Sequence, residues 1–342
     1  MVSFSSDYLE GCHPSILSAL QETNEIQTTG YGLDDYCAHA AGMIRETFGC
    51  PDADVHFVVG GTQANRIVIE SALRPYEGVL CADTGHINVH ETGAVESTGH
   101  KVLALPGKDG RITSAQINVA VALQGDDEHI VKPGMVYISL PTELGTIYNL
   151  TELTDLSMTC RQNGLYLFVD GARLGDAFAA PTNDLQVTDL AGCCDVFTVG
   201  GTKMGALFGE AIVINNPKLK KDFRYFIKRT GGMLAKGRLL GLQFEALMKD
   251  GLYFEIGRKA VGQAQKIREA LIKKGIGMLV DSPTNQLFPI LSDSQMEALE
   301  ENFEFSMWER VDEAHTAIRI CTSFATTEQN VDALIGAINA LA

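Results

Sequence analysis

Three polar segments stand where apolar runs of the sequence end, and their residue types suit the binding and activation of a small molecule. They are Gly60-Gly61-Thr62, Asp170-Gly171-Ala172-Arg173 and Thr202-Lys203. Ligands of open α/β sheets bind at the carboxyl ends of the strands, so polar residues that stop an apolar strand are the first candidates for a site.

The first segment ends a predicted strand and opens a predicted helix. Two glycines let the backbone approach a ligand, and the first turn of a helix offers free N–H groups to an anion. The run Gly60-Gly61-Thr62-Gln63-Ala64-Asn65 matches neither G-x-G-x-x-G nor G-x-x-x-x-G-K-[ST], which argues against a dinucleotide or nucleoside-triphosphate loop. Taken alone, it is equally consistent with a tight turn between strand and helix.

The second and third segments provide a carboxylate and an amine. Asp170 directly follows Leu-Phe-Val, where an unpaired charge would be costly, so it requires a cation: either Arg173 or a protonated ring nitrogen of a bound cofactor. Lys203 lies among glycines and small residues. Partly desolvated and near other cations, it would have a lowered pKa and act as an amine nucleophile; otherwise it is an ordinary loop lysine. An anion-binding loop, an aspartate for a ring nitrogen and a nucleophilic lysine are together what pyridoxal 5'-phosphate requires.

These segments are positioned by strands that alternate with helices over the first two thirds of the chain. We predict strands at 56–60, 79–82, 101–105, 135–140, 165–169, 195–199 and 211–214, and helices at 38–48, 62–73, 113–123 and 151–163. Thr151 is a candidate cap for the last helix, and Gly164 can end it. Several of the strands are continuous apolar runs, which is typical of a parallel sheet covered by helices on both faces.

Beyond about residue 216 the pattern changes to that of a smaller α+β unit. Helices are predicted at 217–228, 236–249, 252–274 and 327–341, and strands at 276–280, 286–291, 303–308 and 317–322. We therefore predict an α/β protein with a mainly parallel central sheet. Its large domain would be residues 1–240, which include the N-terminal segment, and its small C-terminal domain residues 241–342.

Composition narrows the classes of partner and the compartment. With 27 Lys and Arg against 43 Asp and Glu, the net charge is −16, which argues against a nucleic-acid or anionic-membrane partner. No apolar run reaches the roughly 18 residues of a membrane span, and the first residues lack the features of a signal peptide. None of the eight cysteines forms a C-x-x-C pair, so reduced thiols and a cytoplasmic location are expected.

A metal site is a weaker interpretation of the histidines. His86 and His90 are spaced to share one face of a helix, and Glu91 follows them. The motif H-E-x-x-H nevertheless fails because residue 94 is Ala, and no second ligand cluster is evident. We expect no metal.

Taken together, the chain resembles the low-specificity L-threonine aldolases of the β-eliminating lyase family, pyridoxal-phosphate enzymes with the aspartate-aminotransferase-like fold (fold type I). The resemblance runs almost from end to end. It rests on Ser6-Asp7, Gly60-Gly61-Thr62, His86 with Glu91-Thr92-Gly93-Ala94, Asp170-Gly171-Ala172-Arg173, Thr202-Lys203, Gly231-Gly232-Met233 and Arg319. The aspartate motif followed at this interval by the lysine motif is specific, whereas the glycine turns are not.

The resemblance implies a role for each matched residue. Lys203 would form a Schiff base with the cofactor, Asp170 would pair with its ring nitrogen, and His86 would stack on the ring. The phosphate would be held by Gly61, Thr62 and Thr202. The substrate carboxylate would be held by Ser6, Arg173 and Arg319. The alternative for Arg319 is a structural role, in which it pairs with an anion of the protein.

Two departures from the family pattern leave roles open. A histidine that relatives place near the substrate hydroxyl is replaced here by Pro141 or Thr142. The proton of that hydroxyl must then be accepted by His86, which we favour, or by His90 or Glu143. The motif G-G-G-M-R is altered to Thr230-Gly231-Gly232-Met233-Leu234, so a basic contact to the phosphate from a neighbouring subunit would come from Lys228, Arg229 or Lys236.

The activity implied is that of an aldehyde-lyase. It would cleave L-threonine, L-allo-threonine and related β-hydroxy-α-amino acids to glycine and an aldehyde, in a dimer or tetramer with shared active sites. The alternatives are a β-eliminating lyase or an aminotransferase on the same fold, or a non-catalytic protein that binds the cofactor. Intact Lys203, Asp170, Arg173 and Arg319 argue against the last of these.

Overall fold

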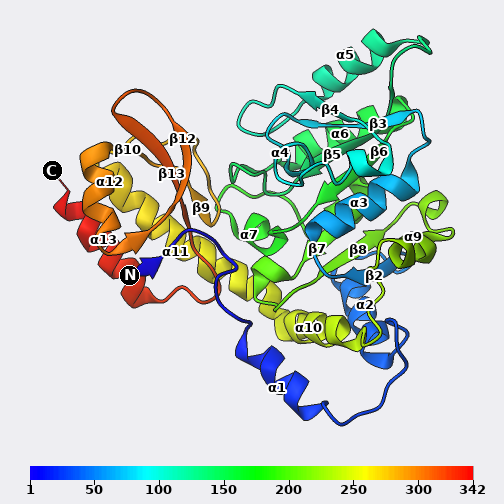
Figure 1. Ribbon diagram of the computed structural model, residues 1–342, viewed down its shortest axis with the longest axis horizontal. Coiled ribbons are helices and arrows are strands. Elements are labelled where there is room, and N and C mark those ends of the chain that lie inside the picture. The colour runs from blue at the N-terminus through cyan, green and yellow to red at the C-terminus, as the bar shows by residue number, and fades with distance from the viewer. Residues whose placement is uncertain (342) are drawn as a thin grey trace.

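The protein is described by a computed structural model, which describes the structure of residues 1–341. Its central feature is a sheet of seven strands, which Figure 1 shows together with the helices around it. Strand order is β2-β8-β7-β6-β5-β3-β4. The strands are β2 (Asp54–Val58), β3 (Glu77–Ala82), β4 (Val102–Leu105), β5 (Lys132–Ser139), β6 (Tyr166–Asp170), β7 (Val196–Gly200) and β8 (Glu210–Ile214). Only β8 runs antiparallel to its neighbours, which confirms the predicted, mainly parallel sheet.

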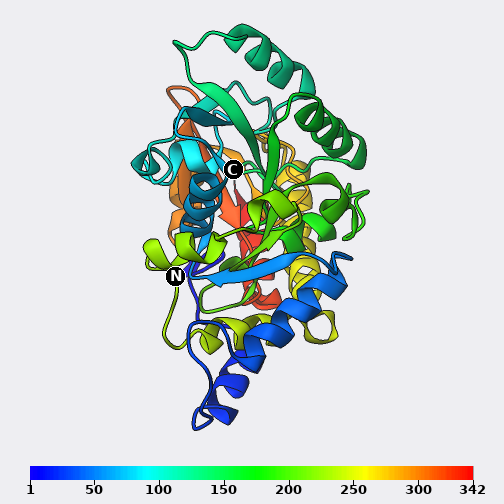
Figure 2. The ribbon, with the colours of Figure 1, turned by 90° about the vertical axis from the view of Figure 1, so that its right-hand side faces the viewer.

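Helices cover both faces of this sheet, as Figures 1 and 2 show. Because successive strand residues point to opposite faces, Leu167 and Val169 enter one core and Phe168 enters the other. The first core is closed by α1 (Pro14–Glu22), α2 (Asp35–Thr47), α6 (Leu150–Gln162) and α10 (Arg238–Met248), and by the shorter α7 (Leu174–Ala179) and α8 (Asp189–Cys193). The second is closed by α3 (Gly61–Ala72), α4 (His86–Val89) and α9 (Phe223–Arg229). Helix α5 (Ser114–Gln124) packs against α6 and β5.

The C-terminal part has its own sheet and core. Strands β9 (Gln286–Leu287), β10 (Ile290–Ser292) and β12 (Ser306–Arg310) pair with β13 (His315–Cys321). Helix α11 (Leu252–Lys274) connects the two halves in Figure 1, and α12 (Asp293–Glu300) and α13 (Glu328–Ala340) complete this unit. The core of this part contains Ile267, Leu287, Ile318, Ile320 and Leu334. None of the helices in residues 1–341 is long and apolar enough to cross a membrane.

The predicted division at residue 240 stays a prediction, and two observations bear on it. The position lies inside α10, a helix that packs against α1 and α2. The first strand, β1 (Val2–Ser3), pairs with β11 (Phe303–Glu304), and Phe4 belongs to the C-terminal core. We therefore propose that residues 2–4 be grouped with the C-terminal unit and the rest of the N-terminal segment with the large one.

Several predicted elements differ from the structure. The helix at 150–162 is capped by Asn149, not Thr151, because Asn149 and Glu152 exchange side-chain and backbone hydrogen bonds. The segment 276–280 is not a strand; it contributes one isolated bridge, Met278 to Pro289. The predicted helix 217–228 is divided into the short turn η3 (Pro217–Leu219) and α9, and Asp222 between them has a φ of 61°. Helices α1, α4, α7, α8 and α12 were not predicted, since segments of four to nine residues show too little periodicity.

Candidate active site

A cavity of about 1100 Å³ lies where the strands of the central sheet end and the C-terminal sheet faces them. It brings together all but one of the predicted site residues: Gly61, Thr62, His86, Asp170, Arg173, Thr202, Lys203 and Arg319. Ser6 does not line this cavity; it is buried next to Asp7. The carboxyl ends of the parallel strands therefore meet the C-terminal sheet at one site, as expected for an open α/β fold.

Asp170 is the last residue of β6, and its buried carboxylate is held by neutral donors. Oδ2 accepts hydrogen bonds from the Tyr137 hydroxyl (2.6 Å) and Asn65 Nδ2 (2.9 Å), and Oδ1 accepts one from the Ala172 N–H (3.0 Å). Among residues 1–341, Asp170 has no ion pair with a cationic side chain. Its pairing with Arg173, the first alternative considered from the sequence, is therefore not present, which leaves the protonated ring nitrogen of a cofactor as the remaining alternative.

Lys203 lies in the short turn η2 (Thr202–Met204), directly after β7, and its side chain lines the cavity. Burial lowers the pKa of Lys203, and the neighbouring charge of Arg173 lowers it further, against the opposing effect of Asp7, Asp170 and Glu210. A lowered pKa increases the fraction of neutral amine, which is the form that attacks a carbonyl carbon.

The first turn of α3 and the η2 turn both line the cavity, at Gly61, Thr62 and Thr202. Gly60, at the N-cap of this helix of 12 residues, makes no side-chain capping bond, and a Cβ at Gly60 would meet nothing within 4 Å. The backbone N–H groups of the first turn are thus available to a phosphate. Thr202 is fixed beside them because its Oγ1 accepts a hydrogen bond from the Gly209 N–H at 3.1 Å.

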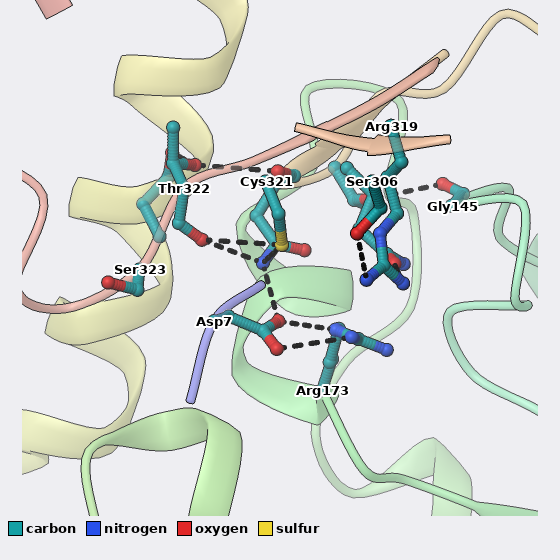
Figure 3. A network of polar contacts seen from close by, with 12 residues as sticks. Asp7, Gly145, Arg173, Ser306, Arg319, Cys321, Thr322 and Ser323 are labelled. Carbon is teal, nitrogen blue, oxygen red and sulfur yellow. Dashed lines mark hydrogen bonds and ion pairs between the residues drawn. The ribbon is translucent and has the colours of Figure 1, made fainter. Parts of the chain in front are cut away.

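Arg173 is paired with Asp7, a partner that the sequence analysis did not predict (Figure 3). Its Nε lies 2.5 Å from Oδ2 of Asp7, its Nη2 lies 3.1 Å from Oδ1, and Asn285 Nδ2 donates to the same carboxylate at 3.0 Å. Burial alone would raise the pKa of Asp7, but the charge and hydrogen bonds of Arg173 hold that pKa at about 2. The pair is therefore ionised at neutral pH and fixes Arg173 at the edge of the cavity.

Arg319, on β13, has no such partner. Its Nη2 donates to the carbonyl of Ser5 at 2.9 Å, and its guanidinium lies 5.9 Å from the centre of the Trp308 ring. Its Nε is buried without a hydrogen-bond partner, and no acidic group of residues 1–341 lies within ion-pair distance. The alternative role of Arg319, with a structural anion as its partner, therefore finds no such anion in this part of the chain. The guanidinium of Arg319 lines the cavity and is therefore available to a ligand carboxylate. The buried hydroxyl of Ser6 also has no hydrogen-bond partner, but Ser6 does not line the cavity.

His86, at the start of α4, is oriented by Glu91. Its Nδ1 lies 2.8 Å from Oε1 of Glu91, a carboxylate that is fully buried and also accepts from Asn65 Nδ2 at 2.8 Å. The same Asn65 amide bonds to Asp170, so one residue links the two carboxylates. Glu91 belongs to a motif that the sequence analysis recognised, but its contact with His86 was not predicted, and neither were the positions of Asn65 and Tyr137.

The other candidates for the hydroxyl base also lie at the cavity. Glu143 accepts from Ser139 Oγ at 2.6 Å and from the backbone N–H of His86 at 2.8 Å, and burial raises the pKa of Glu143. The ring of His90 lies 5.5 Å from that of His86, and burial together with the charge of His86 lowers the pKa of His90. Pro141 and Thr142, which stand in the altered segment noted in the sequence, also line the cavity.

The basic residues proposed for a neighbouring subunit's phosphate do not line this cavity. Lys228 lies over the ring of Tyr31 at 4.7 Å, and Arg229 pairs with Glu70 at 2.9 Å. No group of three or more His, Cys, Asp or Glu side chains in residues 1–341 is arranged to hold a metal ion.

The strand order, the lysine after β7 and the aspartate at the end of β6 define a pyridoxal-phosphate-dependent enzyme of the aspartate-aminotransferase-like fold. The residues fit this cofactor, since the site offers a counter-ion for a ring nitrogen, uncapped N–H groups for a phosphate and an amine of lowered pKa. Residues 4–315 match the sequence pattern of the β-eliminating lyases, and the chain belongs to this family. The predicted fold, family and cofactor are confirmed.

Relatives in this family and in the wider fold agree with that assignment. The chain is 35% identical over 300 residues to a low-specificity L-threonine aldolase of a Pseudomonas species, covering 86% of each protein. It is 45% identical to a Leishmania major threonine aldolase of known structure, with a TM-score of 0.97. The match covers 99% of this chain and 98% of that structure. An aspartate aminotransferase of Thermus thermophilus shares the fold, with a TM-score of 0.72 at 14% identity. That match covers 99% of this chain and 91% of the aminotransferase chain.

Proposed function

We propose that this chain is an aldehyde-lyase that cleaves L-threonine, L-allo-threonine and related β-hydroxy-α-amino acids to glycine and an aldehyde. The observation that carries the proposal is the unpaired guanidinium of Arg319 in the cavity that also contains Lys203 and Asp170. An amino-acid carboxylate would satisfy that guanidinium while the amino group lies toward the lysine. Threonine aldolases at 35% and 45% identity support the reaction.

Each residue of the cofactor site has a distinct task in this proposal. Bound pyridoxal phosphate supplies an electron sink for the charge that remains at Cα when a bond there breaks. Lys203 is assigned to the covalent attachment of the cofactor, and Asp170 to keeping its ring nitrogen protonated. The N–H groups of Gly61 and Thr62, together with the side chain of Thr202, are assigned to the phosphate.

The substrate is oriented by its carboxylate. Arg319 lines the cavity and is available to bind it directly, whereas Arg173 presents to it only the part of its guanidinium that Asp7 does not hold. Ser6 is assigned to the same carboxylate, although its buried hydroxyl lies outside the cavity lining. A two-point grip of a planar guanidinium on a carboxylate fixes the rotation about the Cα bonds. That rotation selects which bond is aligned for cleavage, and alignment of the Cα–Cβ bond gives the aldolase outcome.

His86 is assigned to removing the proton of the β-hydroxyl, as well as to stacking on the cofactor ring. Because the carboxylate of Glu91 accepts hydrogen bonds, we assign the ring N–H of His86 to Nδ1, which would donate a hydrogen bond to Oε1 of Glu91. Nε2 is then the nitrogen able to accept a proton. When the hydroxyl loses that proton and the Cα–Cβ bond breaks, Cβ–OH becomes the carbonyl of the departing aldehyde and the electron pair of the broken bond stays at Cα.

The oligomer and the compartment complete the proposal. We infer a homodimer or homotetramer with shared active sites, because the cavity of a single chain lacks Lys228, Arg229 and Lys236. One of these three residues would then contact a neighbouring subunit's phosphate. A cytoplasmic location is supported by the eight cysteines, all of which are free thiols in the structure.

The test is a product analysis with single threonine isomers. The purified protein with cofactor is incubated with L-threonine and with L-allo-threonine, and glycine, acetaldehyde, ammonia and keto acids are measured. We expect glycine and acetaldehyde in equal amounts, no activity in Lys203→Ala, and full activity in Lys266→Ala, a control in which a surface lysine paired with Glu328 is removed. Ammonia with a keto acid would instead identify an eliminating lyase, and amino transfer to an added keto acid an aminotransferase.

A further inference from the structure

Glu210 lies between the two segments assigned to the cofactor phosphate. It is the first residue of β8, and it pairs with Val58 at the end of β2 and with Gly200 at the end of β7. These two strands lead into the segments that contain Gly61 and Thr202. The backbone therefore places a carboxyl group between the two segments, with Gly209 next to it bonded to Thr202.

The side chain of Glu210 is buried and incompletely bonded. The residue is 3% exposed and lines the cavity, and its Oε1 is 3.9 Å from the position that a Cβ would take on Gly61, the first residue of α3. Its Oε2 is buried without a hydrogen-bond partner anywhere in the part of the chain that the structure describes. An orphaned buried carboxyl oxygen beside a helix N-terminus indicates a polar partner that binds there.

The charges around Glu210 favour its neutral form. Burial and the charge of Asp170 raise the pKa of Glu210 to about 8, although Lys203 and Arg173 act in the opposite direction. Tyr253, from α11, is the other titratable group that interacts with it. At neutral pH most of the carboxyl groups at this position therefore carry a proton that can be donated.

We propose that Glu210 is a cofactor-binding residue that keeps its proton and donates it in a hydrogen bond to the phosphate, so that loss of this proton weakens cofactor binding. The proposal rests on the assignment of the phosphate to Gly61, Thr62 and Thr202. A phosphate dianion repels a carboxylate but accepts a hydrogen bond from a carboxylic acid. Binding therefore favours the protonated form still further, and above a pH of about 8 each unit should lower the affinity about tenfold.

The test measures the affinity of the cofactor-free full chain for pyridoxamine 5'-phosphate between pH 7 and 10. This probe carries the ring and the phosphate of the cofactor but no aldehyde, so it forms no covalent bond to Lys203. Wild type is compared with Glu210→Gln, whose amide donates a hydrogen bond but does not titrate. Titrations common to both proteins cancel in the ratio of their Kd values.

At pH 7 we expect the Kd values of the two proteins for this probe to agree within about threefold. Above pH 8 the Kd of wild type should rise relative to that of Glu210→Gln by about tenfold per pH unit. Asp176→Asn is the matched control. Asp176 is also a buried acid whose pKa is raised by burial, but it does not line the cavity, so its variant should follow wild type. Equal pH dependence of wild type and Glu210→Gln would overturn the role of Glu210 alone. Absence of binding by wild type at every pH would overturn the cofactor site and this proposal together.

Inorganic phosphate gives a second measurement that needs no variant. It has no ring nitrogen, so the protons taken up from the buffer when it binds at pH 9, measured calorimetrically in buffers of different ionisation enthalpy, are gained by protein groups. We expect close to one proton for each phosphate bound by wild type. An uptake of zero would contradict the proposal even if Glu210→Gln failed to fold.

Discussion

Asp7 and Arg173 form a buried, two-point ion pair that joins the beginning of the chain to the turn before α7. The two arginines of the cavity consequently differ, because Arg173 has a carboxylate partner and Arg319 has none. Removal of one partner of a buried pair leaves the other charge uncompensated, which costs about 3–5 kcal/mol of stability. Loss of Arg319 leaves no such charge.

The first prediction separates the two arginines. Arg319→Lys should raise KM and lower kcat while the free energy of unfolding changes little, since a point charge does not reproduce a bidentate grip. Arg173→Ala should lower the free energy of unfolding by about 3–5 kcal/mol. Urea unfolding and steady-state kinetics on both variants provide the check. Equal reaction of amino-acid amides and acids with wild type would show that Arg319 does not bind the carboxylate.

The second prediction concerns the pH dependence of stability. The pKa of Asp7 is about 2 in the folded protein against 3.8 in the unfolded chain, so its stabilisation is present above pH 4 and is lost as the pH falls toward 2. The shift corresponds to about 2 kcal/mol. The difference in unfolding free energy between wild type and Asp7→Asn should therefore shrink by about that amount between pH 5 and pH 2. A constant difference over this range would mean that Asp7 is not ionised in the fold.

The third prediction tests the assignment of Asp170 as the counter-ion of the cofactor's ring nitrogen. Asp170→Asn should retain the cofactor but lose about 3 kcal/mol of transition-state stabilisation, roughly a hundredfold in kcat, because the ring nitrogen is no longer held protonated. Cofactor content by absorbance and kcat for threonine cleavage are the measurements. Asn65 and Tyr137 remain in place as donors, so the substitution changes the charge more than the packing. Near-normal turnover would show that Asp170 has been misassigned.

The fourth prediction separates two roles of His86. His86→Phe preserves a flat ring for stacking but removes both nitrogens. It should bind the cofactor and exchange the Cα proton of glycine, yet cleave β-hydroxy substrates about 10²–10⁴-fold more slowly, as expected for a lost general base. If cleavage and exchange fall together, His86 only positions the cofactor. If neither falls, His90 and Glu143 are the next candidates.

The fifth prediction tests shared active sites. Lys203→Ala and a double variant, Lys228→Ala with Arg229→Ala, should each be inactive and should regain partial activity when mixed under conditions of subunit exchange. Hybrid oligomers would then contain some sites with both functions intact. Because Arg229 also pairs with Glu70, a Glu70→Gln variant is the control for loss of that ion pair alone. No recovery despite proven exchange would show that each site is built within one chain.

The central sheet and the residues at its strand ends could be predicted because their signals are local. Asp170 and Lys203 follow apolar runs of strand length, and α11 was predicted at its observed bounds, 252–274. The partners of these residues could not be predicted in the same way. Asp7 and Arg173 are 166 positions apart in the sequence, and Asn65 and Asp170 are 105 apart. No periodicity or motif links residues at such separations. Glu210 was missed because a glutamate at the start of an apolar strand is usually exposed, and its burial follows from pairing with β2 and β7.

The parallel pair β1 and β11 has a consequence for how the protein is made. A chain leaves the ribosome N-terminus first, so Val2 and Ser3 emerge about 300 residues before the strand with which they pair. Until then Phe4 has no C-terminal core to enter, and Asp7 lacks Asn285. All strands of the central sheet leave the ribosome before the C-terminal partners of the N-terminal segment do. Enzyme activity that depends on the N-terminal segment should therefore appear only after β11 has been released.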